Sequence, residues 1–145
     1  MNFESLIQAN KGQVVTYSKA GGGAGGILLI TFNNNNSIWI WTYWEIWEKG
    51  VLLATVNDDI TAVTGPVARA AHALENLTVL EVYLEKSNLI LTFSQDYVLK
   101  VFSEYDDESD VANWEYWIPS KNKAFTITSK LEVEEGTFFM QPSAK

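Results

Sequence analysis

Short stretches in which apolar and polar residues alternate, separated by groups of turn-forming residues, run along most of this chain. Alternation with a period of two predicts β-strands, because successive side chains of a strand point to opposite faces. The stretch around Thr42 is expected to bend into two strands, and residues 131–145 are expected to form a charged tail. The predicted strands are 13–17, 27–32, 38–47, 51–56, 77–85, 89–93, 97–102, 114–118 and 124–129.

Two further segments have the spacing of helices. Residues 3–9 place three large apolar side chains on one face of a short helix. After Pro66, apolar residues recur at helical spacing as far as residue 74, which predicts a second helix. Proline suits the first helical turn, and Thr64 is the expected N-cap.

The apolar pattern of the first half of the chain returns in the second half. In the clearest cases LLITF returns as LILTF sixty-one positions later, and WEIW returns as WEYW. The matching segments, first copy and then second, are 15–17 and 81–83, 28–32 and 89–93, 38–41 and 99–102, and 44–47 and 114–117. A repeat of this kind sets the architecture before any single element is assigned.

The sequence therefore predicts one domain, residues 1–145, that contains two pseudo-repeats at about 1–62 and 63–130. Each copy would be marginal alone, so the two are expected to share one core. Each is expected to hold one helix and a meander of four to five antiparallel strands. The resulting twisted sheets would pack face to face, which is an α+β, mostly β fold.

The amino-acid composition excludes more classes of function than any motif does. The chain has 18 acidic and 10 basic residues, a net charge of −8, and no cysteine. An acidic surface repels nucleic-acid phosphates and anionic lipid and attracts basic proteins, so we expect no binding to nucleic acid or membranes. The absence of thiols, of a signal-peptide pattern and of a membrane-length apolar run is typical of a cytoplasmic protein.

The glycine-rich segment and the one histidine are the first candidates for chemistry. Gly21, Gly23 and Gly26 fit the spacing G-x-G-x-x-G, but a dinucleotide site needs a helix after the glycines, and here a strand is predicted. We therefore expect a hairpin loop and no cofactor. His72 lacks cysteine or histidine partners for a metal, and we interpret it as a structural or surface residue.

Glu45 and Glu115 occupy equivalent places in the two W-E-x-W segments. Paired carboxylates can act as a general acid and base, or bind a cation. Alternation instead predicts that both face solvent while the neighbouring aromatic residues face the core. No nucleophile with an adjacent base is recognisable in the sequence, so no enzymatic activity is expected.

The densest charge run lies between two predicted strands. Its members are Glu104, Asp106, Asp107, Glu108 and Asp110, with Tyr105 and Trp114 close by in sequence. Such runs are often solvated loops, and the alternative is an acidic docking face with an aromatic anchor. The spacing does not fit a calcium loop, and we expect no metal site. Glu132, Glu134 and Glu135 form a second acidic cluster.

A small, acidic, cysteine-free, strand-rich chain with the order L-x-L-x-F, turn, L-x-V-F, acidic loop and W-E-x-W resembles the immunity proteins of bacterial toxin systems. Within these it is similar to immunity proteins of contact-dependent growth inhibition. The resemblance implies a protein that binds and neutralises a cognate basic toxin domain, expected to be a nuclease that acts on RNA. These proteins block the toxin's active site or its access to substrate.

The duplicated layout of a helix plus four strands is also similar to the whirly single-stranded-DNA-binding fold. That resemblance implies a nucleic-acid-binding or housekeeping interaction module. Tryptophan-rich strands can stack bases, but such surfaces also carry interleaved lysine and arginine. Residues 27–56 contain a single basic residue, Lys49, so core packing is the better interpretation of these tryptophans.

Overall fold

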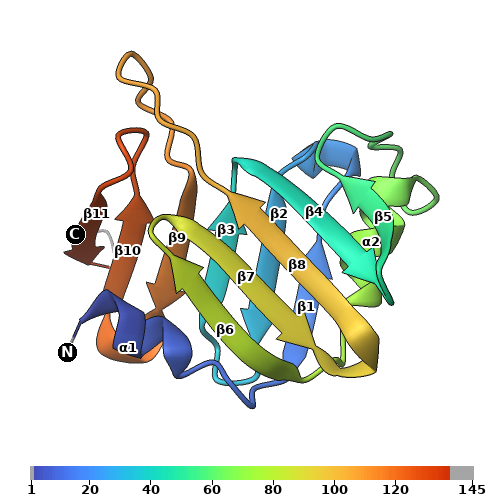
Figure 1. The fold of residues 1–145 in the computed structure, drawn as a ribbon, viewed down its shortest axis with the longest axis horizontal. Helices are drawn as coiled ribbons and strands as arrows, with labels where there is room; N and C mark the ends of the chain where they lie inside the picture. Colours follow the sequence, from blue (N-terminus) through green and yellow to red (C-terminus); the bar gives the residue numbers. More distant parts are fainter. Residues whose placement is uncertain (1, 138–145) are drawn as a thin grey trace, which may run out of the picture.

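The predicted strands assemble into two antiparallel sheets in this computed structural model, which describes residues 2–137 (Figure 1). The six-stranded sheet holds, in spatial order, β1 (Val15–Lys19), β2 (Leu28–Phe32), β3 (Ser37–Ile40), β9 (Trp114–Ile118), β10 (Lys123–Ile127) and β11 (Val133–Thr137). The five-stranded sheet holds β5 (Val51–Thr55), β4 (Tyr43–Glu48), β8 (Tyr97–Phe102), β7 (Asn88–Phe93) and β6 (Val79–Glu85). The helices are α1 (Phe3–Gln8) and α2 (Pro66–Ala73), and short 3-10 turns are η1 (Gly22–Ala24), η2 (Ser94–Asp96) and η3 (Pro119–Lys121). The predicted α+β, mostly β class is confirmed.

Each sheet combines strands from both halves of the chain. β1, β2 and β3 are joined by β9, β10 and β11, whereas β6, β7 and β8 are joined by β4 and β5. The meander expected within each copy therefore ends after its third strand, and the strands that follow lie in the other sheet. In the first half the crossing lies at the predicted bend, where Thr42 separates β3 from β4. The alternation of apolar and polar residues indicates which face of a sheet a side chain occupies, but not which strand lies next to it. The sequence therefore did not reveal this exchange of strands.

The two halves also meet directly, just before β1 and β6 begin. Val14 and Thr78 form an isolated antiparallel bridge. Next to it, Val15 N and Val79 N each donate a hydrogen bond to a carbonyl of the other half, at 2.9 and 2.8 Å. The paired bonds follow an approximate twofold axis that passes through this bridge.

Phe32 and Phe93 hold equivalent positions, which fixes the register of the repeat. Phe32 pairs with Val15, Phe93 pairs with Val79, and a register shift follows Val15 and Val79 alike. Both phenylalanine rings are buried in the one core cluster that the halves share. The predicted match of residues 15–17 with 81–83 is therefore wrong by two positions, because Val15 corresponds to Val79.

The two W-E-x-W segments match as predicted. Trp44 and Trp114 are both fully buried. Trp44 Nε1 donates to Gly26 O at 2.8 Å, and Trp114 Nε1 donates to Ser87 O at 3.0 Å. Since Gly26 and Ser87 each lie two residues before the equivalent leucines Leu28 and Leu89, the two indoles hold the same place in the two halves.

The helices lie on opposite open sides of the sandwich (Figure 1). α2 packs against β1 of one sheet and β5 of the other. On the other side α1 contacts β6, and its Phe3 ring lies 5.7 Å from Trp114 and 5.3 Å from Phe125 of the opposite sheet. Each helix thus closes the gap between an edge strand and the facing sheet.

Two local predictions need correction. The N-cap of α2 is Gly65 and not Thr64, with Pro66 in the first turn as expected. The segment predicted as a charged tail forms β11, which pairs with β10 along all five residues, Val133–Thr137. Its side chains are exposed on both faces, so it lacks the apolar alternation that predicts a strand. The rest of that segment, 138–145, lies outside the described residues.

Two connections break the approximate symmetry. The first half joins β1 to β2 through the glycine-rich residues 20–27, whereas β6 and β7 are joined by residues 86–87. The second half joins β8 to β9 through residues 103–113, whereas β3 and β4 are joined by residues 41–42. Because the shorter version suffices for the fold in each case, these two insertions are the places where function is best sought.

Candidate functional site

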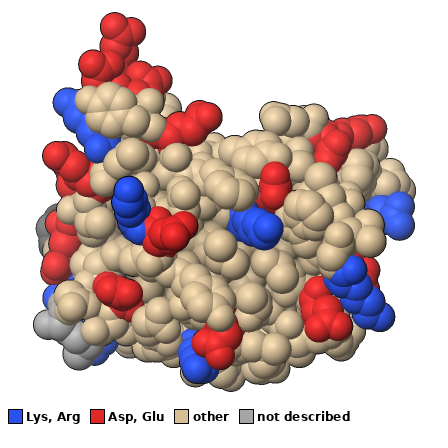
Figure 2. Space-filling view, in the orientation of Figure 1, with Lys and Arg blue, Asp and Glu red and all other residues tan. Residues whose placement is uncertain are grey.

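The acidic loop, residues 103–113, projects beyond the end of the sandwich (Figure 1). Figure 2 shows a group of acidic side chains at the tip that stands clear of the body. The exposed residues are Glu104, Tyr105, Asp106, Asp107, Glu108 and Asp110. None of these carboxylates forms an ion pair with any residue between 2 and 137.

The base of the acidic loop is held by Asn113, which is 6% exposed. Its amide nitrogen donates to Glu104 O at 3.0 Å and Thr128 O at 2.9 Å, and its Oδ1 accepts from Glu104 N at 2.9 Å. The Asn113 carbonyl accepts from Trp41 N and Thr42 N, which form the equivalent connection in the other half. One buried side chain therefore joins both ends of the loop to both sheets.

The hairpin between β10 and β11 supports the loop further out. Asp106 N donates to Ser129 O at 2.7 Å, and Ser129 Oγ donates to Ser109 O at 2.6 Å. Glu108 N donates to Asp106 Oδ1, which closes a tight turn at the tip. Backbone and hydroxyl bonds thus hold the carboxylates in place without neutralising them.

The two aromatic residues proposed as anchors differ in the structure. Tyr105 is 62% exposed, and Val111, which the sequence did not single out, is 63% exposed. Trp114 is fully buried and packs against Phe3, so it cannot contact a partner in this structure. Its alternation with Tyr116 and Ile118, both buried, was the signal that Trp114 belongs to the core.

The second acidic cluster lies on and just before the edge strand β11. Glu132, Glu134 and Glu135 are exposed. Lys123 Nζ lies 3.0 Å from Glu135 Oε2, so part of this charge is paired. Charged side chains on an edge strand also discourage pairing with another chain, which gives this cluster a role without any partner.

Glu45 and Glu115 do not form a pair. They lie in different sheets, on outward-facing positions of β4 and β9. Each accepts a hydrogen bond from a tryptophan on its own strand, Trp47 Nε1 at 2.9 Å and Trp117 Nε1 at 3.1 Å. The two carboxylates are therefore too far apart to act together as a general acid and base, the role weighed for them from the sequence.

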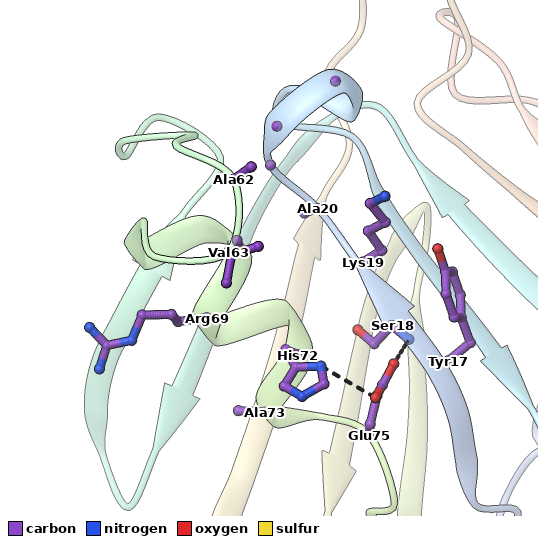
Figure 3. Close-up of a pocket in the computed structure, with 14 residues that line it drawn as sticks. Tyr17, Ser18, Lys19, Ala20, Ala62, Val63, Arg69, His72, Ala73 and Glu75 are labelled. Carbon is purple, nitrogen blue, oxygen red and sulfur yellow. Dashed lines mark hydrogen bonds and ion pairs between the residues drawn. The ribbon is translucent and has the colours of Figure 1, made fainter.

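A pocket of about 710 Å³ lies between β1, α2 and the glycine-rich connection (Figure 3). Its charged lining residues are Lys19, Arg69, His72 and Glu75. Sequence reasoning took His72 and the glycines one at a time and missed this pocket. The available signal was that the chain's one histidine and one arginine both lie in the second helix, which the fold places beside the glycines.

The pocket contains a serine, a histidine and a glutamate, but they are not arranged for nucleophilic catalysis. Glu75 Oε1 lies 3.3 Å from His72 Nδ1, and Glu75 Oε2 accepts from Ser18 N at 3.1 Å. The Ser18 hydroxyl has no hydrogen-bond partner in the part of the chain that the structure describes. Activation of a serine requires a base in contact with that hydroxyl, and His72 does not make the contact. His72 itself is 77% exposed, as expected for a surface residue.

Within the described residues, no three imidazole or carboxylate groups gather closely enough to hold a metal ion. Neither helix of residues 2–137 has the length and apolar character needed to cross a membrane. Comparison of the chain with protein-family models, curated proteins and solved structures finds no match. The functional argument therefore rests on the acidic loop and the pocket.

Proposed function

We propose that this protein is an immunity protein that neutralises a basic toxin domain by docking its acidic loop onto it. The observation that carries the proposal is the insertion of residues 103–113 between β8 and β9. In the other half of the molecule the equivalent connection, between β3 and β4, consists of residues 41–42 alone. The insertion adds unpaired negative charge and contributes no strand to either sheet. A segment that the fold does not need, yet holds in a defined shape, suits a role in recognition.

The charges favour a basic protein as the partner. Unpaired carboxylates near a protein surface attract lysine and arginine and accelerate encounter. Fixing the loop through Asn113 and Ser129 lowers the entropy lost on binding, because the loop is ordered beforehand. In this proposal the protein acts in the cytoplasm, where a toxin nuclease would reach its RNA substrate.

Tyr105 and Val111 would supply the apolar centre of the interface. Tyrosine is enriched at interface positions that dominate affinity, because it buries a large area with few rotatable bonds. The surrounding carboxylates would form the charged rim. Docking over the toxin's catalytic or RNA-binding surface, which must be basic to bind phosphates, would block activity.

The direct test is protection in cells. The C-terminal toxin domain that the proposal expects in a neighbouring reading frame would be expressed from an inducible promoter, with the full chain supplied from a second plasmid. We expect growth to be rescued by the natural chain and not by a variant with Tyr105→Ala and Val111→Ala. Equal rescue by the two, at equal protein levels, would show that the loop is not the docking face.

A nucleic-acid-binding module is the second candidate, and one observation favours it. The rings of Trp39, Trp41 and Trp117 lie together on the outer face of the six-stranded sheet, with centroids 6.0 and 5.7 Å apart. Bases can stack on such rings. The carboxylate of the neighbouring Glu115, however, would repel a nucleic-acid phosphate. A titration with single-stranded DNA, monitored by tryptophan fluorescence, tests whether this face binds nucleic acid. Binding tighter than about 1 μM at physiological salt would favour this candidate, because nonspecific binding is typically weaker.

A further inference from the structure

The pocket beside α2 contains a buried polar group without a partner. Ser18 is 3% exposed, and its Oγ makes no hydrogen bond with the described residues. Figure 3 shows its side chain directed from β1 toward α2, into the space that the pocket occupies. A buried hydroxyl without a partner costs about 1–3 kcal/mol. A ligand that reaches this hydroxyl would remove the cost.

The pocket also contains unpaired positive charge in a protein of net charge −8. Lys19 lines it and forms no ion pair with residues 2–137, whereas the guanidinium of Arg69, another lining residue, is directed away from the pocket (Figure 3). The one carboxylate, Glu75, has both oxygens engaged, by His72 and by the Ser18 backbone. Lys19 and the Ser18 hydroxyl are both donors without a partner among the described residues, so the lining favours an acceptor such as an anionic group.

The backbone N–H groups of the glycine-rich connection show whether the pocket is suited to a phosphate or to a simpler anion. Phosphate sites of this kind present several free backbone N–H groups. Here Gly21 N donates to Gly25 O, Gly22 N to Ile60 O, and Ala24 N to Gly21 O. Since these donors are already used, the loop forms a wall of the pocket and not a cradle for phosphate.

The other walls of the pocket are apolar and closely packed. The methyl groups of Ala20, Ala62, Ala68 and Ala73 line it. A side chain at Gly21 would lie 3.1 Å from the Ala68 methyl, so the absence of one there lets the wall close. A volume of about 710 Å³ lies within the roughly 300–1,000 Å³ of small-molecule sites.

We propose that this pocket binds a small organic carboxylate, whose oxygen accepts a hydrogen bond from Ser18 and whose apolar body packs on the alanine walls. Lys19 balances its charge from the rim. This site lies on the side of the molecule away from the acidic loop (Figure 1), so it is independent of the proposed docking function.

The proposal is tested by nuclear magnetic resonance titration of the isotope-labelled full chain. The probes are sodium benzoate and sodium hexanoate, with benzamide and hexanamide as their neutral matches and inorganic phosphate as the competing anion. We expect at least one carboxylate to shift amide signals at residues 18–23 and 68–75 saturably, with a Kd of about 1 mM or tighter. Its amide and phosphate should bind at least tenfold more weakly.

Two variants and one control identify the groups involved. Ser18→Ala should weaken the carboxylate at least fivefold without lowering the melting temperature, and Lys19→Met should also weaken it. Lys100→Met, which removes a lysine 5.0 Å from the Trp47 ring on the other sheet, should leave binding unchanged. The proposal is overturned if neither carboxylate gives saturable shifts, if acid and amide bind equally, or if Ser18→Ala and Lys19→Met both bind as well as the natural chain.

Discussion

Val14 and Thr78 face each other in an antiparallel bridge, and each occupies the same place in its own half of the chain. Beyond this bridge the first half gives β4 and β5 to the five-stranded sheet and the second half gives β9, β10 and β11 to the six-stranded sheet, so that β3 pairs with β9 and β4 pairs with β8. Neither half can lose its structure without removing strands from both sheets. We therefore expect the two copies to unfold as one cooperative unit, although the sequence pattern consists of two copies.

Equivalent core substitutions should consequently have similar effects. Phe32→Ala and Phe93→Ala each remove a buried ring, and each should lower the free energy of unfolding by about 3–5 kcal/mol. Unfolding in urea, followed by tryptophan fluorescence and circular dichroism, should show one transition for both variants. Leu80→Ala, at a position 48% exposed, is the control and should change stability little. Two separate transitions would contradict the shared core.

Gly26 and Gly23 lie in the same connection and should respond differently to alanine. A Cβ at Gly26 would lie 2.5 Å from Val56 Cγ2, whereas a Cβ at Gly23 meets nothing within 4 Å. Moving Gly26 would also disturb the carbonyl that accepts from Trp44 Nε1. We expect Gly26→Ala to cost about 1–3 kcal/mol and Gly23→Ala to be neutral or stabilising by about 0.4–1 kcal/mol. Chemical denaturation measures both, and equal effects would refute the close packing at Gly26.

Asn113→Ala should release the acidic loop. It leaves the Glu104 and Thr128 carbonyls without their donor, at a cost of about 2 kcal/mol or more. Hydrogen exchange should accelerate at Glu104, whose amide donates to Asn113 Oδ1, and a glutamate-specific protease should cleave within the loop. The matched control is Asn57→Ala, at an exposed position, which should do neither. Unchanged exchange in the Asn113 variant would mean that the loop is ordered by other contacts.

Tyr116 should make the protein sensitive to alkaline pH. Burial raises the pKa of its hydroxyl above the ordinary value, although hydrogen bonds from Asn10 and Asn36 partly oppose the shift. Above about pH 10 the unfolded chain releases this proton while the folded chain retains it, so stability falls as pH rises. The pKa values of Tyr43 and Tyr97 are raised as well, by a hydrogen bond to Glu45 and by burial respectively.

The test is the free energy of unfolding between about pH 8 and 12. Tyr116→Phe should be less stable at neutral pH, because the amides that donate to the hydroxyl lose their acceptor. Its decline above pH 10 should be shallower than that of the natural chain, with the remainder due to the other two tyrosines. An identical slope would exclude Tyr116 as a source of the alkaline sensitivity.

The elements of this fold were predictable because large apolar side chains mark the core face of nearly every strand. The partners of the strands were not, because Trp44 and Trp114 show the same alternation whichever sheet they join. The two-residue error in aligning Val15 arose because the β1–β2 connection is longer than the β6–β7 connection, so the offset between equivalent positions changes along the repeat.

The candidate sites were likewise only partly predictable from the sequence. The acidic loop was visible as a run of charge, but nearness in sequence suggested Trp114 as an exposed anchor when it belongs to the core. The pocket brings Ser18 to residues of a helix more than fifty positions away, so it depends on tertiary structure. Besides the one histidine and one arginine on α2, the placement of a serine at an inward position of β1 was a signal in the sequence that could have indicated it.

The central claim, that the acidic loop docks onto a basic toxin domain, is tested most directly by charge reversal. Asp106, Asp107 and Glu108 are changed together to lysine, and Glu132, Glu134 and Glu135 are changed together in a matched variant with the same change in net charge. Association and dissociation rates with the toxin domain that the proposal expects in a neighbouring reading frame are measured by surface plasmon resonance at low and high salt. Melting temperatures confirm that both variants remain folded.

The account predicts that reversal in the loop slows association by about tenfold or more at low salt, with a smaller effect at high salt because exposed charges are screened. The matched variant should bind nearly as the natural chain does. Normal binding by the loop variant, or an equal loss in both variants, would contradict the account and leave the acidic loop as a solvated connection.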